Sequence, residues 1–140
     1  MSEIIYPRSP REMMAGWTYL PRFIDKIRLH LAGKLHADYQ ENFCKGFDEA
    51  WLKAAGVKAE EFIQVVKDSL TDGEVYDWTR ANVKKSDAEK AALNQFILNR
   101  GSDTDDSKAR LQWRKEQAGL THRTDVHTFV DFIDADEKRI

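Results

Sequence analysis

A histidine and two aspartates near the C-terminus form the sharpest chemical cluster in the sequence. His127, Asp131 and Asp134 recur at positions i, i+4 and i+7, which share one face of a helix. An imidazole and two carboxylates aimed at one point can bind a divalent metal ion, with His122 reaching in from the preceding loop. The same set could pair a histidine base with an orienting carboxylate. The alternative is a solvated helix surface on which Asp131 meets a partly charged His127.

The single cysteine is the second candidate for chemistry. Cys44 stands beside Lys45 in the segment NFCKGFD, between two aromatic residues. A neighbouring cation favours the thiolate, which is the nucleophile of cysteine chemistry, and His30 or His36 could act as its base. Because free cysteine is among the most buried residue types, the alternative is a small core residue.

Three cations and a leucine in the first part of the chain predict a ligand site. Arg22, Lys26 and Leu29 lie on the side of a predicted helix opposite its apolar stripe, and Arg11 lies upstream near a helix N-terminus. Arginine forks and helix N-termini both bind carboxylate or phosphate groups. A leucine among the charges predicts that this side also packs, within the fold or on a partner. The alternative is ion pairing with Asp25 and nearby acids.

Helix signals recur along the chain, and alternating strand patterns are almost absent. The segment Ser9-Pro10-Arg11-Glu12 matches a capping box and predicts a short helix that Gly16 closes. Asp48 is expected to be an N-cap, and Leu70 to lie on a buried helix face. Further helices are predicted over 21–33, 48–56, 59–70 and 106–118, and one from 126 onward. Two more are predicted to begin at the capping boxes 71–74 and 86–89.

Length and composition predict one domain over residues 1–140. Together with the helix signals, they predict an all-α bundle of about six helices with short loops. The 22 Lys and Arg residues nearly balance the 24 Asp and Glu residues and are spread evenly, so a nucleic-acid partner is not expected. No apolar run approaches the ~18 residues of a membrane span. The lone cysteine fits a reducing cytoplasm. Trp113 lies in the least periodic helix and is the candidate for an exposed or interfacial aromatic residue.

Three long segments resemble one known family. The segments occur in this order between residues 8 and 139, so the similarity extends over nearly the whole chain: RSPREMMAGWTYLPRFIDKIRLHLAGKL, ENFCKGFDEAWLKAAGV and HTFVDFIDADEKR. They are similar to a bacterial family known only as a domain of unknown function, DUF5069. The resemblance implies a small single-domain bacterial protein, and it implies no activity, substrate or catalytic residue.

The sequence thus leaves two classes of function open. The first is a non-enzymatic module that binds a protein partner or a small anionic ligand through Arg11, Arg22, Lys26 and Leu29. The second is a small enzyme that works at the His127 cluster, with or without a metal, or at Cys44. Neither a glycine-rich phosphate loop nor a Gly-x-Ser-x-Gly elbow is present in the sequence. The first class is preferred, with cofactor, partner and oligomeric state left open.

Overall fold

Eight helices and one two-stranded hairpin make up residues 4–140, the part of the chain that the computed structural model describes. This confirms the mostly helical class, with eight helices in place of about six. No helix within this part is long and apolar enough to cross a membrane. The elements are β1 (Met13–Met14), β2 (Trp17–Thr18), α1 (Leu20–Leu31), α2 (Ala37–Gln40), α3 (Phe47–Ala55), α4 (Ala59–Asp68), α5 (Asp72–Asn82), α6 (Asp87–Asn99), α7 (Asp105–Ala118) and α8 (Phe129–Asp136).

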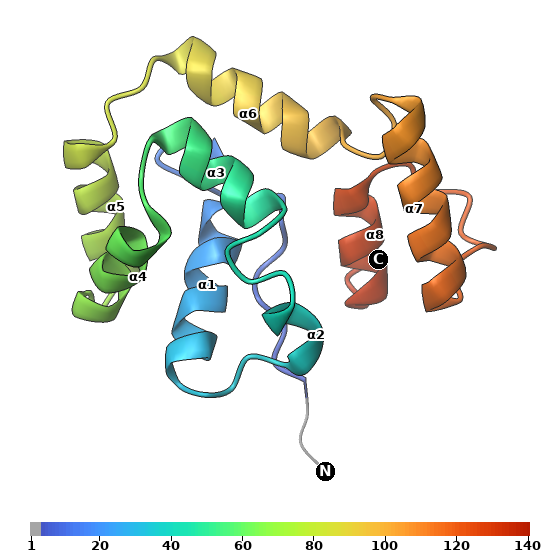
Figure 1. Ribbon diagram of the computed structural model, residues 1–140, viewed down its shortest axis with the longest axis horizontal. Coiled ribbons are helices and arrows are strands. Elements are labelled where there is room, and N and C mark those ends of the chain that lie inside the picture. Colours follow the sequence, from blue (N-terminus) through green and yellow to red (C-terminus); the bar gives the residue numbers. More distant parts are fainter. Residues whose placement is uncertain (1–3) are drawn as a thin grey trace.

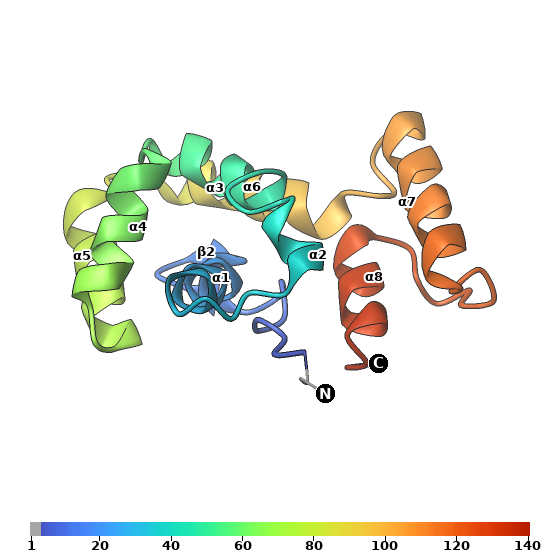
Figure 2. The same ribbon diagram turned by 60° about the horizontal axis from the view of Figure 1, so that its bottom comes forward.

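Helix α6 connects the two ends of the molecule. At one end α4 and α5 lie side by side, and at the other end α7 packs beside α8 (Figures 1 and 2). Between these ends, α1 lies in the middle of the fold with α3 beside it (Figure 1). The hairpin contacts α6, so the N-terminal part of the chain meets the long connecting helix.

Two helices, α5 and α6, begin where signals in the sequence predict. Ser86 Oγ accepts a hydrogen bond from the Glu89 N–H at 3.1 Å, and the Glu89 carboxylate accepts one from the Ser86 N–H at 3.1 Å. This reciprocal pair confirms the capping box at the start of α6. At α5 only half of the predicted capping box forms. The Thr71 hydroxyl accepts from the Glu74 N–H at 3.3 Å, but the Glu74 carboxylate accepts from the Leu70 N–H at 3.2 Å and not from that of Thr71.

The short helix predicted after Ser9 is wrong, because this segment forms a turn and the β1–β2 hairpin. Ala15 (φ 55°) and Gly16 (φ 84°) make a two-residue connection in which both residues have positive φ. Such turns match the twist of paired strands. The Ser9 hydroxyl does not cap a helix and instead donates to Asp134 at 3.0 Å. An Ala-Gly pair is a weak turn signal, so the capping-box pattern dominated the prediction.

Three further details differ from the prediction. The N-cap of α3 is Gly46, and Asp48 lies inside the first turn, where buried cationic and hydroxyl groups bind its carboxylate. Leu70 is exposed because α4 already ends at Asp68. The four-residue helix α2 was missed, since it is too short to show a periodic pattern.

Two apolar clusters hold the described residues together. The larger cluster contains five buried aromatic rings, among which the Trp51 centroid lies 4.7 Å from Phe62 and 6.1 Å from Trp17. The smaller cluster lies between α7 and α8 and contains Leu111 and Phe132. Val130 of α8 belongs to the larger cluster, so α8 joins both. A single domain over the whole chain stays a prediction.

Candidate functional site

Two of the cations expected to bind a ligand are buried in internal ion pairs. Arg22 is 3% exposed, and its guanidinium donates to both oxygens of Glu137 at 2.9 and 2.7 Å. Lys26 is buried with its Nζ 2.8 Å from the Asp48 carboxylate. Leu29, from the same helix, is half-buried. The charges of Arg22 and Lys26 are therefore used inside the fold.

The partner of Arg22 is the centre of a larger network. Glu137 also accepts from the Tyr39 hydroxyl at 2.7 Å and from Arg139 at 2.5 Å. Burial alone would raise the pKa of Glu137, but the hydrogen bonds from Arg22, Tyr39 and Arg139 outweigh it and hold the pKa below its usual range. The network ties the C-terminus to α1 and α2.

The predicted metal ligands lie close to Arg11. Its guanidinium contacts Asp131 and donates to Asp134 at 2.6 Å. Asp131 also accepts from the backbone N–H of His127 at 2.9 Å. Within residues 4–140, no three His, Cys, Asp or Glu side chains are grouped so as to hold a metal ion. A metal site at His127, Asp131 and Asp134 stays a prediction that would require Arg11 to release both carboxylates.

Cys44 lies in surroundings that favour its neutral form. Burial, together with the negative charge of Asp48, raises the pKa of the half-buried thiol to about 11. The Asp48 carboxylate also accepts from the backbone N–H of Cys44 at 2.9 Å. The thiol therefore stays protonated near neutral pH, which argues against a nucleophile there.

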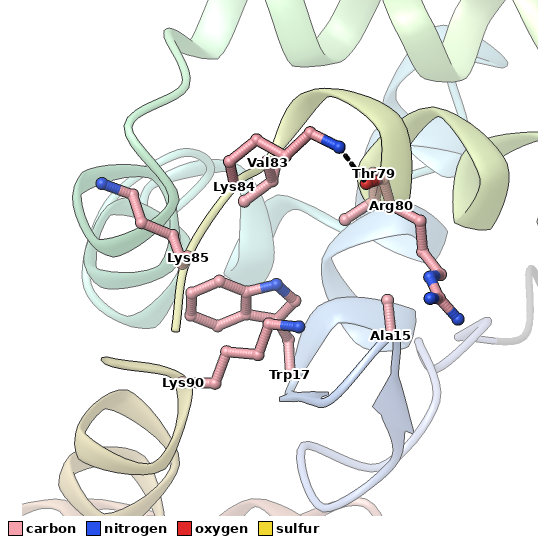
Figure 3. Close-up of a pocket in the computed structure, with 8 residues that line it drawn as sticks. All are labelled: Ala15, Trp17, Thr79, Arg80, Val83, Lys84, Lys85 and Lys90. Carbon is pink, nitrogen blue, oxygen red and sulfur yellow. Dashed lines mark hydrogen bonds between the residues drawn. The ribbon is translucent and has the colours of Figure 1, made fainter. Parts of the chain in front are cut away.

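A cavity that the sequence analysis missed lies between the hairpin, the end of α5 and the start of α6 (Figure 3). Its volume is about 170 Å³. Half of its lining side chains are cations, and no carboxylate lines it. We call it the basic pocket; it is lined by Ala15, Trp17, Thr79, Arg80, Val83, Lys84, Lys85 and Lys90.

The hairpin is fixed against α6 by one asparagine. The Asn94 side chain accepts from the Thr18 N–H at 2.8 Å and donates to the Gly16 carbonyl at 3.0 Å. A Cβ at Gly16 would lie 3.1 Å from Cδ of Lys90, so the stem of Lys90 passes directly over this glycine. Gly16 therefore serves both the turn, through its positive φ, and the placement of Lys90.

Three of the four cations in the basic pocket lack a carboxylate partner among the described residues. Lys85 pairs with Glu89 at 3.8 Å. Arg80 instead donates to the Tyr76 hydroxyl at 3.0 Å, and Lys84 Nζ lies 3.5 Å from the Arg80 carbonyl oxygen. Lys90 forms no ion pair within the described part of the chain. The pocket thus concentrates uncompensated positive charge.

Trp17 adds a neutral donor to these cations. The residue is 1% exposed, and no hydrogen bond from its indole N–H is found among the described residues. Unlike the indole N–H of Trp51, it is not a fully buried donor without a partner. Figure 3 shows its five-membered ring on the side of Arg80 and its six-membered ring toward Lys85. The hydroxyl of Thr79 is already used, since it donates to the Val75 carbonyl at 2.8 Å.

A weak signal for this pocket exists in the sequence. Arg80, Lys84, Lys85 and Lys90 are spaced so that they flank one interhelix connection. The even spread of charge over the whole chain hid this local concentration. The contribution of Trp17 could not be predicted, because the strand that contains it was not recognised: the short helix predicted after Ser9 ends at Gly16, directly before Trp17.

Comparison with known proteins gives a family and no activity. A family model described as "Domain of unknown function (DUF5069)" matches residues 4–139, nearly the whole chain. A search of curated proteins found no match. The function is therefore argued from the geometry of the site.

Proposed function

The chain belongs to the DUF5069 family, whose function is unknown, and from the geometry of the basic pocket we propose that it is a non-enzymatic module that binds a small anion. One observation carries the proposal. Arg80, Lys84 and Lys90 surround one cavity and have no carboxylate partner among the described residues. Like charges gathered without counterions repel one another, and an anion that binds between them relieves this repulsion.

The size of the pocket limits the ligand. Pockets that enclose drug-sized molecules measure roughly 300–1,000 Å³, and the basic pocket measures about 170 Å³. It accommodates a small anion, or the anionic end of a larger molecule whose remainder lies in solvent.

The basic pocket replaces the anion site predicted from the sequence as the place for this ligand. Arg11, Arg22 and Lys26 already have carboxylate partners within the protein. A second groove, between α4 and α5, has the opposite charge because Glu61, Asp68 and Glu74 line it. A protein partner contacting the exposed Trp113 is a separate prediction.

Isothermal titration calorimetry with inorganic phosphate and with citrate, at constant ionic strength, tests the proposal. We expect the double variant Lys84→Gln/Lys90→Gln to bind at least about tenfold more weakly than the wild type, because each lysine supplies a charge-assisted hydrogen bond. The matched control, Lys34→Gln/Lys108→Gln, removes the same charge from exposed positions outside the pocket and should bind within about twofold of the wild type.

Two results would contradict this function. If both double variants lose affinity equally, the effect is one of net charge and the pocket is not the site. If the wild type binds neither anion, the concentration of cations has another role.

A further inference from the structure

We infer that the anion held by the basic pocket is a phosphoryl group, either free phosphate or the phosphate end of a small ester. This inference rests on the proposed function and names its ligand class. Three features of the pocket support the phosphoryl group: its donors come from different sides, their positive charge is largely uncompensated, and no charged acceptor lines the pocket.

The donors of the basic pocket come from four separate segments. Trp17 belongs to the hairpin, Arg80 to α5, Lys84 to the connection after α5, and Lys90 to α6. In Figure 3 these side chains surround the pocket from different sides. A carboxylate is planar, and a single guanidinium fork satisfies both of its oxygens. A phosphoryl group has three strong acceptor oxygens in a tetrahedral arrangement, and it can use donors from several directions at once.

The charge of the pocket fits a dianion. Arg80, Lys84 and Lys90 have no carboxylate partner among the described residues, and Lys85 is only weakly compensated, by Glu89 at 3.8 Å. A phosphate ester carries about −1.5 to −2 charges at neutral pH, whereas a single carboxylate carries one. The phosphoryl group therefore compensates more of the positive charge.

The pocket offers charged donors and no charged acceptor. No carboxylate lines it, and the Thr79 hydroxyl donates to Val75 within its own helix. Sugar hydroxyls are commonly recognised through carboxylate acceptors, as in the binding of a ribose by an acidic residue. The pocket is therefore built to bind anion oxygens. The remainder of an ester would extend out of the cavity of about 170 Å³.

The inference is tested by calorimetry with three small probes at about pH 8, where phosphate esters are dianionic. The probes are inorganic phosphate, methyl phosphate and malonate, a dicarboxylate of similar charge. We expect phosphate or methyl phosphate to bind at least about tenfold more tightly than malonate. Equal affinity for both phosphates indicates an ester as ligand, and preference for inorganic phosphate indicates the free ion; either supports the inference.

Two variants locate the contacts. Arg80→Gln should weaken phosphate binding about tenfold, because it removes a guanidinium fork. Trp17→Phe removes the indole N–H and keeps an aromatic ring, and should weaken phosphate binding by about threefold or more. Circular dichroism checks that each variant is folded. Arg110→Gln, on the exposed surface of α7, is the control and should bind as the wild type does.

Failure of this inference differs from failure of the proposed function. Malonate binding as tightly as phosphate, with both affinities lost in Lys84→Gln/Lys90→Gln, would overturn the phosphoryl assignment and keep the anion module. No binding by any probe would overturn both. A short single-stranded oligonucleotide that binds more tightly than methyl phosphate, through the same two lysines, would overturn the small-ligand assignment in favour of nucleic acid.

Discussion

Replacing Arg22 with alanine is expected to lower the free energy of unfolding by about 3–5 kcal/mol, because it leaves a buried carboxylate without its main partner. Glu137 is 5% exposed and receives both donors of the Arg22 fork. Urea unfolding followed by circular dichroism measures the change. The control is Arg110→Ala, an exposed arginine on α7 with no carboxylate partner among the described residues, which should cost no more than about 0.5 kcal/mol.

The ion pair of Arg22 and Glu137 also makes the stability of the protein depend on pH. The folded-state pKa of Glu137 lies below its usual value, so the stabilisation is fully present above the unfolded pKa and is lost as the pH falls through the folded pKa. Glu137→Gln should therefore flatten the decline of stability below about pH 4.5. Equal unfolding energies for Arg22→Ala and Arg110→Ala would show that the Arg22 pair does not hold the C-terminus in place.

Replacing Trp51 with alanine has the second large expected effect: it should lower the free energy of unfolding by about 3–5 kcal/mol. Trp51 is 0% exposed and packs on Trp17, Phe23 and Phe62, so its removal leaves a large cavity in the main cluster. Trp113 provides a matched control because it is 58% exposed. Trp113→Ala should lower the free energy of unfolding by no more than about 0.5 kcal/mol.

Two additional results would refine this core prediction. The Trp51 indole N–H is buried without a hydrogen-bond partner in the described residues. Because Trp51→Phe removes this unsatisfied donor, it should lower the free energy of unfolding clearly less than Trp51→Ala does. Similar losses for Trp51→Ala and Trp113→Ala in urea unfolding would contradict the assignment of Trp51 to the core. Because Trp51 supports Trp17, the alanine variant should also weaken anion binding.

Local helix signals in the sequence were dependable where a side chain acts on its own backbone. The capping box of Ser86 and Glu89 and the Thr71 cap predicted the starts of α6 and α5, since both depend on residues within three positions. The same pattern failed at Ser9, whose hydroxyl bonds to Asp134, far away in the sequence. A local rule cannot include such a distant partner.

The candidate site was harder to predict for the same reason. Sequence spacing singled out Arg22 and Lys26 as ligand-binding cations, but the chain folds two acids, Glu137 and Asp48, onto them. The cations that stay uncompensated are those for which folding brings no acid within reach, such as Lys90. Which charges are neutralised is a property of tertiary structure. The exposure of Trp113, by contrast, followed from its weakly periodic helix and is confirmed.

The most direct test of the account is an NMR titration of the ¹⁵N-labelled protein with inorganic phosphate. The chain has four tryptophans, and each gives its own indole N–H signal, so the three outside the pocket are internal controls. We predict that the Trp17 indole signal shifts in a saturable way and that the exposed Trp113 signal stays in place. A Trp17 signal that does not move while phosphate binds, or that moves no more than that of Trp113, would contradict anion binding in the basic pocket.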